Sequence, residues 1–218
     1  NRLGPELLPE GKLPKPTEFS ASSVETWLHQ PLHHAVDLRS DRSAFMAGHL
    51  KGAIFAPLAG GKLPLSAGSY LTPEHHLLLV VEDESQVEPA VRQLIRIGLA
   101  RIAGWVLAEK SHGNTTTTPS RTSELGHLLE LHPNAAVLDV RGSSEFATSH
   151  VDGAKNIAYT RLAARLGELD RSKLQLVHCG SGLRASMAVS FLESQGFDTI
   201  LVNGDFSAIP HELLAPRS

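Results

Sequence analysis

The feature that most constrains the fold of this chain is an internal repeat. Asp37-Leu38-Arg39 has the same pattern as Asp139-Val140-Arg141, and the residues after each tripeptide keep their order and nearly their spacing. The later pairs are Phe45 with Phe146, His49 with His150, Gly52-Ala53 with Gly153-Ala154, and Gly98 with Gly196. A five-residue run also recurs, as 77–81 in the first copy and 174–178 in the second. The fold must therefore be built twice from the same elements.

Each copy places short apolar runs between amphipathic segments. Runs such as 77–81 are too short for buried helices and fit strands that are covered on both faces of a sheet. Strands that alternate with helices favour a parallel sheet flanked by helices on both faces. The predicted fold class is therefore α/β, with one such sheet in each half. Predicted strands cover 35–39, 77–81, 136–140, 174–178 and 199–202, and predicted helices cover 17–30, 88–97, 124–131 and 184–195.

The length of 218 residues suits two domains of about 100 residues each. Four consecutive threonines, residues 115–118, stand between Gly113 and Pro119 in a stretch without apolar periodicity, which is typical of a linker. The predicted organisation is a proline-rich lead-in segment at 1–16, a first domain at 17–110, the linker at 111–121 and a second domain at 122–218.

Composition excludes several classes of function. Apolar residues make up 41% of the chain, but no run approaches the roughly 18 residues that span a bilayer, so no membrane association is expected. The formal charge is −3 without a Lys/Arg tract, which argues against nucleic acid as a partner. A single cysteine excludes an internal disulfide and a Cys-rich zinc site. The 12 histidines show no ligand spacing, so we expect no metal and no other cofactor.

The start of the chain at Asn1 lacks a signal-type apolar core. Together with the sparse use of cysteine, this favours a piece of a longer cytoplasmic protein. The sequence leaves the oligomeric state open, a homo-oligomer included.

The single cysteine, Cys179, stands at the end of a predicted strand and before a predicted helix. The intervening loop contains Gly180 and Gly182, which allow the backbone to turn its N–H groups toward one point. The helix N-terminus and Arg184 add positive charge there. We expect this setting to lower the pKa of the thiol from about 8.5 and to favour a nucleophilic thiolate. The alternative is a small buried side chain without a chemical role.

Two other interpretations use the same loop. Residues 180–185 satisfy the G-x-G-x-x-A pattern of dinucleotide-binding proteins, but too few residues follow Asp205 to complete such a sheet. Cysteine phosphatases and arsenate reductases also bind an oxyanion above a thiolate. Their loops have five residues between Cys and Arg, whereas four separate Cys179 from Arg184. The shorter loop is better matched to a single sulfur atom.

Two motifs in the second half resemble the rhodanese family of sulfurtransferases. The C-x-S-G-x-R loop of that family is matched by residues 179–184. The upstream motif is matched by Asp139-Val140-Arg141, Glu145-Phe146 and residues 150–157. The resemblance covers 120–210 strongly and 17–106 weakly. It implies two rhodanese-like domains in tandem.

The resemblance implies an enzyme that transfers sulfane sulfur through a persulfide of Cys179. The donor would be a small anion, thiosulfate or a low-molecular-weight persulfide, and the acceptor a thiol or cyanide. Cys179 and Arg184 would be the catalytic residues, with Arg184 orienting the donor. The loop amides and two hydroxyls would bind the substrate, through Gly180, Ser181, Gly182, Leu183 and Ser186. Structural roles fall to Asp139, Arg141, Glu145 and His150.

The first copy departs from the family pattern. Its counterpart of the catalytic loop is 81–86, Val-Glu-Asp-Glu-Ser-Gln, which lacks the cysteine, the glycine pair and the arginine. Three carboxylates there would repel an anionic donor. This half is therefore expected to be degenerate and without catalysis. The opening residues 1–8 resemble the end of the metallo-β-lactamase-fold domain in persulfide dioxygenase–rhodanese fusions. The alternative function is then a non-catalytic scaffold or regulatory module for such an upstream domain.

Overall fold

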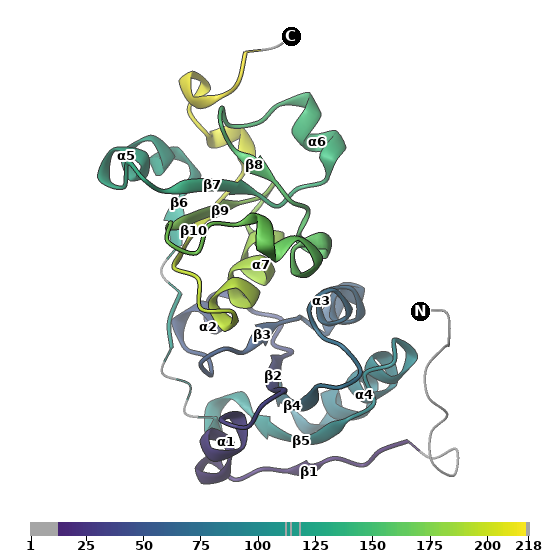
Figure 1. Cartoon of the computed structure of the whole chain (residues 1–218). Helices are drawn as coiled ribbons and strands as arrows, with labels where there is room; N and C mark the ends of the chain where they lie inside the picture. The colour runs from purple at the N-terminus through teal and green to yellow at the C-terminus, as the bar shows by residue number, and fades with distance from the viewer. Residues whose placement is uncertain (1–12, 112, 114, 118, 217–218) are drawn as a thin grey trace. The chain divides into compact units, whose positions relative to one another are not determined.

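The computed structural model describes residues 13–111, 113, 115–117 and 119–216. They form two compact units that divide between Thr116 and Thr117 (Figure 1). The first contains strands β1 (Thr17–Glu18), β2 (His33–Asp37), β3 (Ile54–Phe55), β4 (His76–Val81) and β5 (Ile102–Leu107), and helices α1 (Ala21–Leu28), α2 (Arg42–Ala47), α3 (Lys62–Tyr70) and α4 (Val87–Arg96). The second contains strands β6 (Pro119–Arg121), β7 (Ala136–Asp139), β8 (Lys155–Asn156), β9 (Gln175–His178) and β10 (Thr199–Asn203), and helices α5 (Leu125–Leu131), α6 (Ser143–Thr148) and α7 (Leu183–Ser194).

The two sheets have the same topology. The strand order is β1-β5-β4-β2-β3 in the first unit and β6-β10-β9-β7-β8 in the second, and neighbouring strands pair in parallel. Each strand of one sheet therefore has a counterpart at the same place in the other. The predicted α/β class is confirmed, with two parallel sheets flanked by helices.

The residues that revealed the repeat also have matching local structure. Asp37 and Asp139 each accept hydrogen bonds from the backbone N–H and the guanidinium of the arginine two positions later. His49 stacks on Phe45 with ring centroids 4.1 Å apart, and His150 stacks on Phe146 at 4.0 Å. In both pairs, Nδ1 of the histidine lies 2.9 Å from the backbone oxygen of the phenylalanine.

The long helix of each unit ends in the same way. Gly98 and Gly196 have φ values of 87° and 77°, which a residue with a Cβ rarely adopts. The next residue in each case donates its N–H to a carbonyl five positions earlier, from Leu99 to Leu94 and from Phe197 to Leu192. This is the hydrogen bond of a Schellman motif, and it turns the chain toward the following strand.

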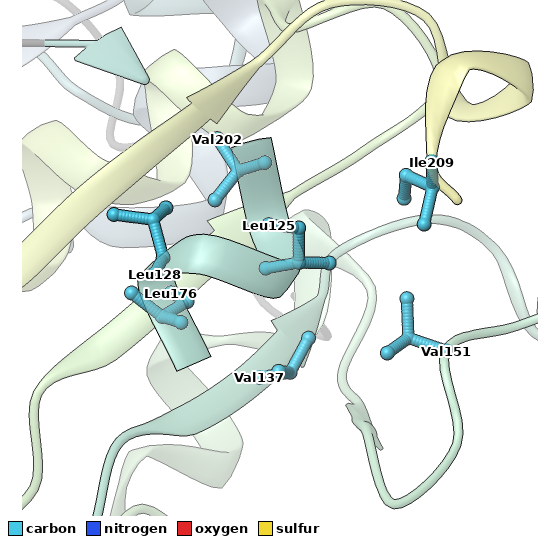
Figure 2. Close-up of a cluster of buried hydrophobic side chains, with 7 residues drawn as sticks. All are labelled: Leu125, Leu128, Val137, Val151, Leu176, Val202 and Ile209. Carbon is cyan, nitrogen blue, oxygen red and sulfur yellow. The ribbon is translucent and has the colours of Figure 1, made fainter. Parts of the chain in front are cut away.

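The core of the second unit includes an apolar cluster on one face of its sheet. Figure 2 shows side chains from α5, from the strands and from two loops converging there. The members are Leu125, Leu128, Val137, Val151, Leu176, Val202 and Ile209. Because side chains alternate along a strand, Val177 and Cys179 face the other side, where α7 packs against β9 and β10. This alternation sets the face on which the thiol lies.

Several predicted boundaries need correction. The predicted helix at 17–30 begins later, at Ala21, because Thr17–Glu18 forms β1 beside β5. The last three residues of the predicted linker form β6, which pairs with β10. Thr115 exchanges backbone hydrogen bonds with His49, and Thr117 donates to Glu193, so this linker is anchored to one unit on each side of Thr116. Residues 1–12 of the predicted lead-in segment lie outside the described residues, as does the resemblance at 1–8.

Four histidines lie together where β2 and β4 begin. The rings of His34 and His75 have centroids 4.8 Å apart, and those of His33 and His76 are 4.9 Å apart. Burial, together with the charges that His75 and His33 would carry, lowers the pKa of His34 to about 4. His34 is therefore neutral in the folded unit at neutral pH.

We expect the first unit to lose stability as the pH falls from about 6.5 to about 4. Over that range the unfolded chain takes up a proton at His34 that the folded unit does not bind. The loss from this residue should be about 1–2 kcal/mol once solvent screening is discounted. Denaturant unfolding at pH 7 and pH 4.5 measures it, because Trp27 and Trp105 both report on this unit.

The comparison is between the wild type and His34→Gln, since carboxylates also titrate in this range. The variant should lose less stability on acidification. Its control is His127→Gln, which changes an exposed histidine of the second unit. Equal pH dependence in the wild type and His34→Gln would contradict the prediction.

Candidate active site

Cys179 lies directly after strand β9, at the carboxyl end of the central strand of the second sheet. Cys179 is almost fully buried, with 1% of its surface exposed. The backbone N–H of Gly182 donates a hydrogen bond to Sγ over 3.1 Å. Gly182 has a φ of 94° and stands at the N-cap of α7, so a left-handed turn points this amide at the sulfur. The predicted contact between loop amides and the thiol is thus present at Gly182.

The other loop residues have distinct environments. The carbonyl of Gly180 accepts a hydrogen bond from the N–H of Phe206 over 3.0 Å, which fixes the loop to the segment after β10. Ser181 is exposed, and Leu183 is the first residue of α7. Ser186 is buried, and its hydroxyl donates to the Gly182 carbonyl over 2.9 Å. This bond stabilises the first turn of α7 and directs the Ser186 hydroxyl into the helix.

Arg184 forms a two-point ion pair with Glu145 of α6. Nη1 donates to Oε2 over 2.6 Å and Nη2 donates to Oε1 over 2.8 Å. Hydrogen bonding to Arg184 lowers the pKa of Glu145 to about 2, and the same bonds raise the pKa of Arg184, with a further contribution from the Cys179 side chain. The guanidinium is therefore held by the carboxylate and also interacts with the Cys179 side chain.

The motif predicts a structural role for Glu145, but nothing in the sequence predicts its pairing with Arg184. The two residues are 39 positions apart, and no periodicity links them. The one indication in the sequence is that Glu145-Phe146 belongs to the upstream motif. Its meaning depends on α6 facing the start of α7, which only the fold reveals. Tyr159 also lies near enough for Arg184 to influence its pKa, which burial raises.

Asp139 and Arg141 form a buried ion pair at the end of β7. The guanidinium donates to both carboxylate oxygens, at distances from 2.6 to 3.0 Å, and also to the Ser149 carbonyl over 2.7 Å. The same guanidinium lies 3.6 Å from the ring centroid of Phe206. This ion pair joins β7, the end of α6 and the segment after β10. With His150 stacked on Phe146, the geometry supports structural roles for Asp139, Arg141 and His150.

His178 precedes Cys179 but lies on the opposite face of the strand. Its ring is buried, stacks on Phe206 with centroids 5.7 Å apart, and has Nε2 3.8 Å from Asp139 Oδ2. Burial lowers its pKa, so the ring is neutral at neutral pH. This position supports the prediction that His178 is not the general base for Cys179.

Within the described part of the chain, no three His, Cys, Asp or Glu side chains gather as a metal site requires. No helix there has the length and apolar character needed to cross a bilayer.

Comparison with known proteins agrees with the motifs of the second unit. The family model described as rhodanese-like domain matches residues 122–211. The thiosulfate sulfurtransferase GlpE of Shewanella oneidensis is 34% identical over 73 residues, which cover 33% of this chain and 72% of that protein. The chain belongs to the rhodanese-like family. The tRNA sulfurtransferase of Vibrio vulnificus is 31% identical over 83 residues, or 36% of this chain, and the match spans only 17% of that relative.

Solved structures with similar folds include two rhodanese-related proteins. A rhodanese-like domain protein from Staphylococcus aureus is 26% identical, with a TM-score of 0.43, over 47% of this chain and 100% of that one. The thiosulfate sulfurtransferase of Pseudomonas aeruginosa is 20% identical, with a TM-score of 0.39, over 89% of this chain and 40% of that one.

The rhodanese-like unit should depend strongly on its buried ion pair. Asp139→Asn would leave the Arg141 guanidinium buried without a countercharge, at a cost of about 3–5 kcal/mol. Amide hydrogen exchange of peptides from β7 and β9 in denaturant measures this cost for the second unit alone. Asp152→Asn, an exposed position in the same unit, should change exchange little. A loss below about 1 kcal/mol in Asp139→Asn would contradict the prediction.

Proposed function

We propose that this protein is a sulfurtransferase that carries sulfane sulfur as a persulfide on Cys179. The observation that carries the proposal is the hydrogen bond from the Gly182 N–H to Cys179 Sγ at the N-terminus of α7. An amide donor, a helix N-terminus and the Arg184 guanidinium all favour negative charge on that sulfur. The family membership of the chain agrees with this chemistry.

The proposed reaction has two steps. The Cys179 thiolate attacks the outer sulfur of thiosulfate or of a low-molecular-weight persulfide, and sulfite or a thiolate leaves with the electron pair. A thiol or cyanide acceptor then attacks the outer sulfur of the Cys179 persulfide and regenerates the thiolate. The Gly182 amide holds the charge on sulfur, and Arg184 orients the donor.

We propose that the first unit is a degenerate rhodanese-like domain in tandem with the active one. The matching strand order and the repeated Asp-Arg and Phe-His pairs support this relationship. In the first unit, the loop that corresponds to the catalytic loop is closed by hydrogen bonds between its own residues. The amide of Glu82 donates to Gln86 Oε1 over 2.8 Å, and Gln86 Nε2 donates back to Glu82 Oε2 over 3.1 Å. The strand registers align Val80 with His178, so Val81 stands where the second unit has its thiol and the carboxylate of Glu82 follows it.

The competing function is a scaffold or regulatory module for an upstream metallo-β-lactamase-fold domain. In that case Cys179 would have no chemical role. The near-complete burial of Cys179 favours this alternative, whereas the amide aimed at its sulfur favours sulfur transfer.

Incubation with thiosulfate followed by intact mass measurement separates the two functions. We expect the wild type to gain one sulfur atom, which excess cyanide removes as thiocyanate, and Cys179→Ser to gain none. Equal masses before and after incubation, with a persulfide donor tested in parallel, would favour the scaffold.

Arg184→Ala should lower the rate of sulfur transfer from thiosulfate by about one to three orders of magnitude, because it removes the cation beside the reacting sulfur. The rate of thiocyanate formation measures this effect. Arg165→Ala is a matched control, since Arg165 forms a similar two-point pair with Glu168 in the same unit. An unchanged rate in Arg184→Ala would show that the guanidinium does not serve the donor.

A further inference from the structure

The Glu145 carboxylate is hydrogen-bonded to Arg184, the residue proposed to orient the donor at Cys179. Arg184 contacts the loop closely, because a methyl group added at Gly180 would lie 2.9 Å from its Nη2 and 3.8 Å from Glu145 Oε1. Both partners reach solvent, with 30% of the Arg184 side chain and 41% of the Glu145 side chain exposed. A donor that approaches the loop from solvent therefore meets a cation and an anion together.

The ion pair changes what this site offers to an anion. A free guanidinium presents five N–H donors and a full positive charge, whereas Glu145 occupies a donor on each of Nη1 and Nη2. With a pKa of about 2, Glu145 stays ionised throughout the neutral range, so its charge offsets that of Arg184. The loop sequence predicts that Arg184 adds positive charge there and orients the donor. The structure replaces it with a pair of zero net charge.

We propose that Glu145 determines donor specificity at Cys179, by disfavouring doubly charged donors such as thiosulfate relative to singly charged ones. This inference rests on the proposed sulfur transfer. Each additional negative charge on the donor interacts with Glu145 beside the loop of Cys179, where repulsion is only partly screened. The preferred substrate class is a small sulfane-sulfur donor with a single negative charge, such as an otherwise neutral alkyl persulfide.

Two probes differ mainly in this charge. Thiosulfate is a dianion, whereas methanethiosulfonate has a methyl group in place of one charged oxygen and is a monoanion. With either probe the Cys179 thiolate forms a bond to the outer sulfur, and the sulfur–sulfur bond of the donor breaks. The electron pair leaves on sulfite or on methanesulfinate, and Cys179 holds the persulfide anion. Total charge is conserved in both reactions.

The experiment measures the second-order rate constant for sulfur loading of Cys179 by each probe, by quenched intact mass measurement. The informative quantity is the thiosulfate-to-methanethiosulfonate ratio, because the intrinsic reactivities of the probes cancel between variants. Glu145→Gln removes the charge and should raise this ratio about tenfold at low salt. Glu145→Asp keeps the charge and should leave the ratio within about threefold of the wild type. Added salt should reduce the difference between Glu145→Gln and the wild type.

Glu168→Gln is the matched control, because it breaks a two-point Arg–Glu pair elsewhere in the same unit. Its ratio should equal that of the wild type. An unchanged or lower ratio in Glu145→Gln would overturn the proposal, and an equal loss of rate with both probes would show that Glu145 only positions Arg184. If neither probe loads the wild type, the sulfur-transfer proposal itself fails. Glu145→Asp also tests the inference if Glu145→Gln does not fold, because a shift in its ratio as large as tenfold would contradict a role based on charge.

Discussion

The buried ion pair between Asp139 and Arg141 is the interaction on which the geometry of the site depends. It neutralises two charges that the interior could not otherwise hold, and its second guanidinium bond captures the Ser149 carbonyl at the end of α6. That contact fixes the short helix that presents Glu145. Glu145 in turn holds Arg184 beside the loop of Cys179. The environment of the thiol is therefore set by a series of polar contacts that begins one strand away.

The first unit has an equivalent ion pair but no cysteine. Asp37 and Arg39 reproduce the bonds of Asp139 and Arg141, including the one to a carbonyl at the end of the next helix, here Gly48. The position that corresponds to Glu145 is Ala44, and the loop after β4 carries no thiol. The ion pair is thus common to both units, whereas the thiol of Cys179 belongs to the second unit alone.

Much of this structure was predictable because the relevant signals are local. The apolar runs at β4, β7 and β9, the glycines that end α4 and α7, and the position of Cys179 after a strand follow from residues adjacent in sequence. The two-residue strands β1, β3 and β8 could not be predicted in this way, because so few residues carry no periodicity and depend on a neighbouring strand. The Glu145–Arg184 pair was missed because it depends on tertiary structure. The Ser186 hydroxyl is predicted to bind the substrate, yet it donates a hydrogen bond to the Gly182 carbonyl at the start of its own helix.

The anchoring of the segment between the units determines where the chain can be divided. Thr115 is hydrogen-bonded to the first unit through His49, and Thr117 is bonded to the second through Glu193, so Thr116 is the residue between the two anchors. A cut at the start of the predicted second domain would remove β6 and leave the β10 edge of that sheet unpaired. Expression of the second half alone should therefore begin at Thr117 or earlier, where its outermost strand is retained.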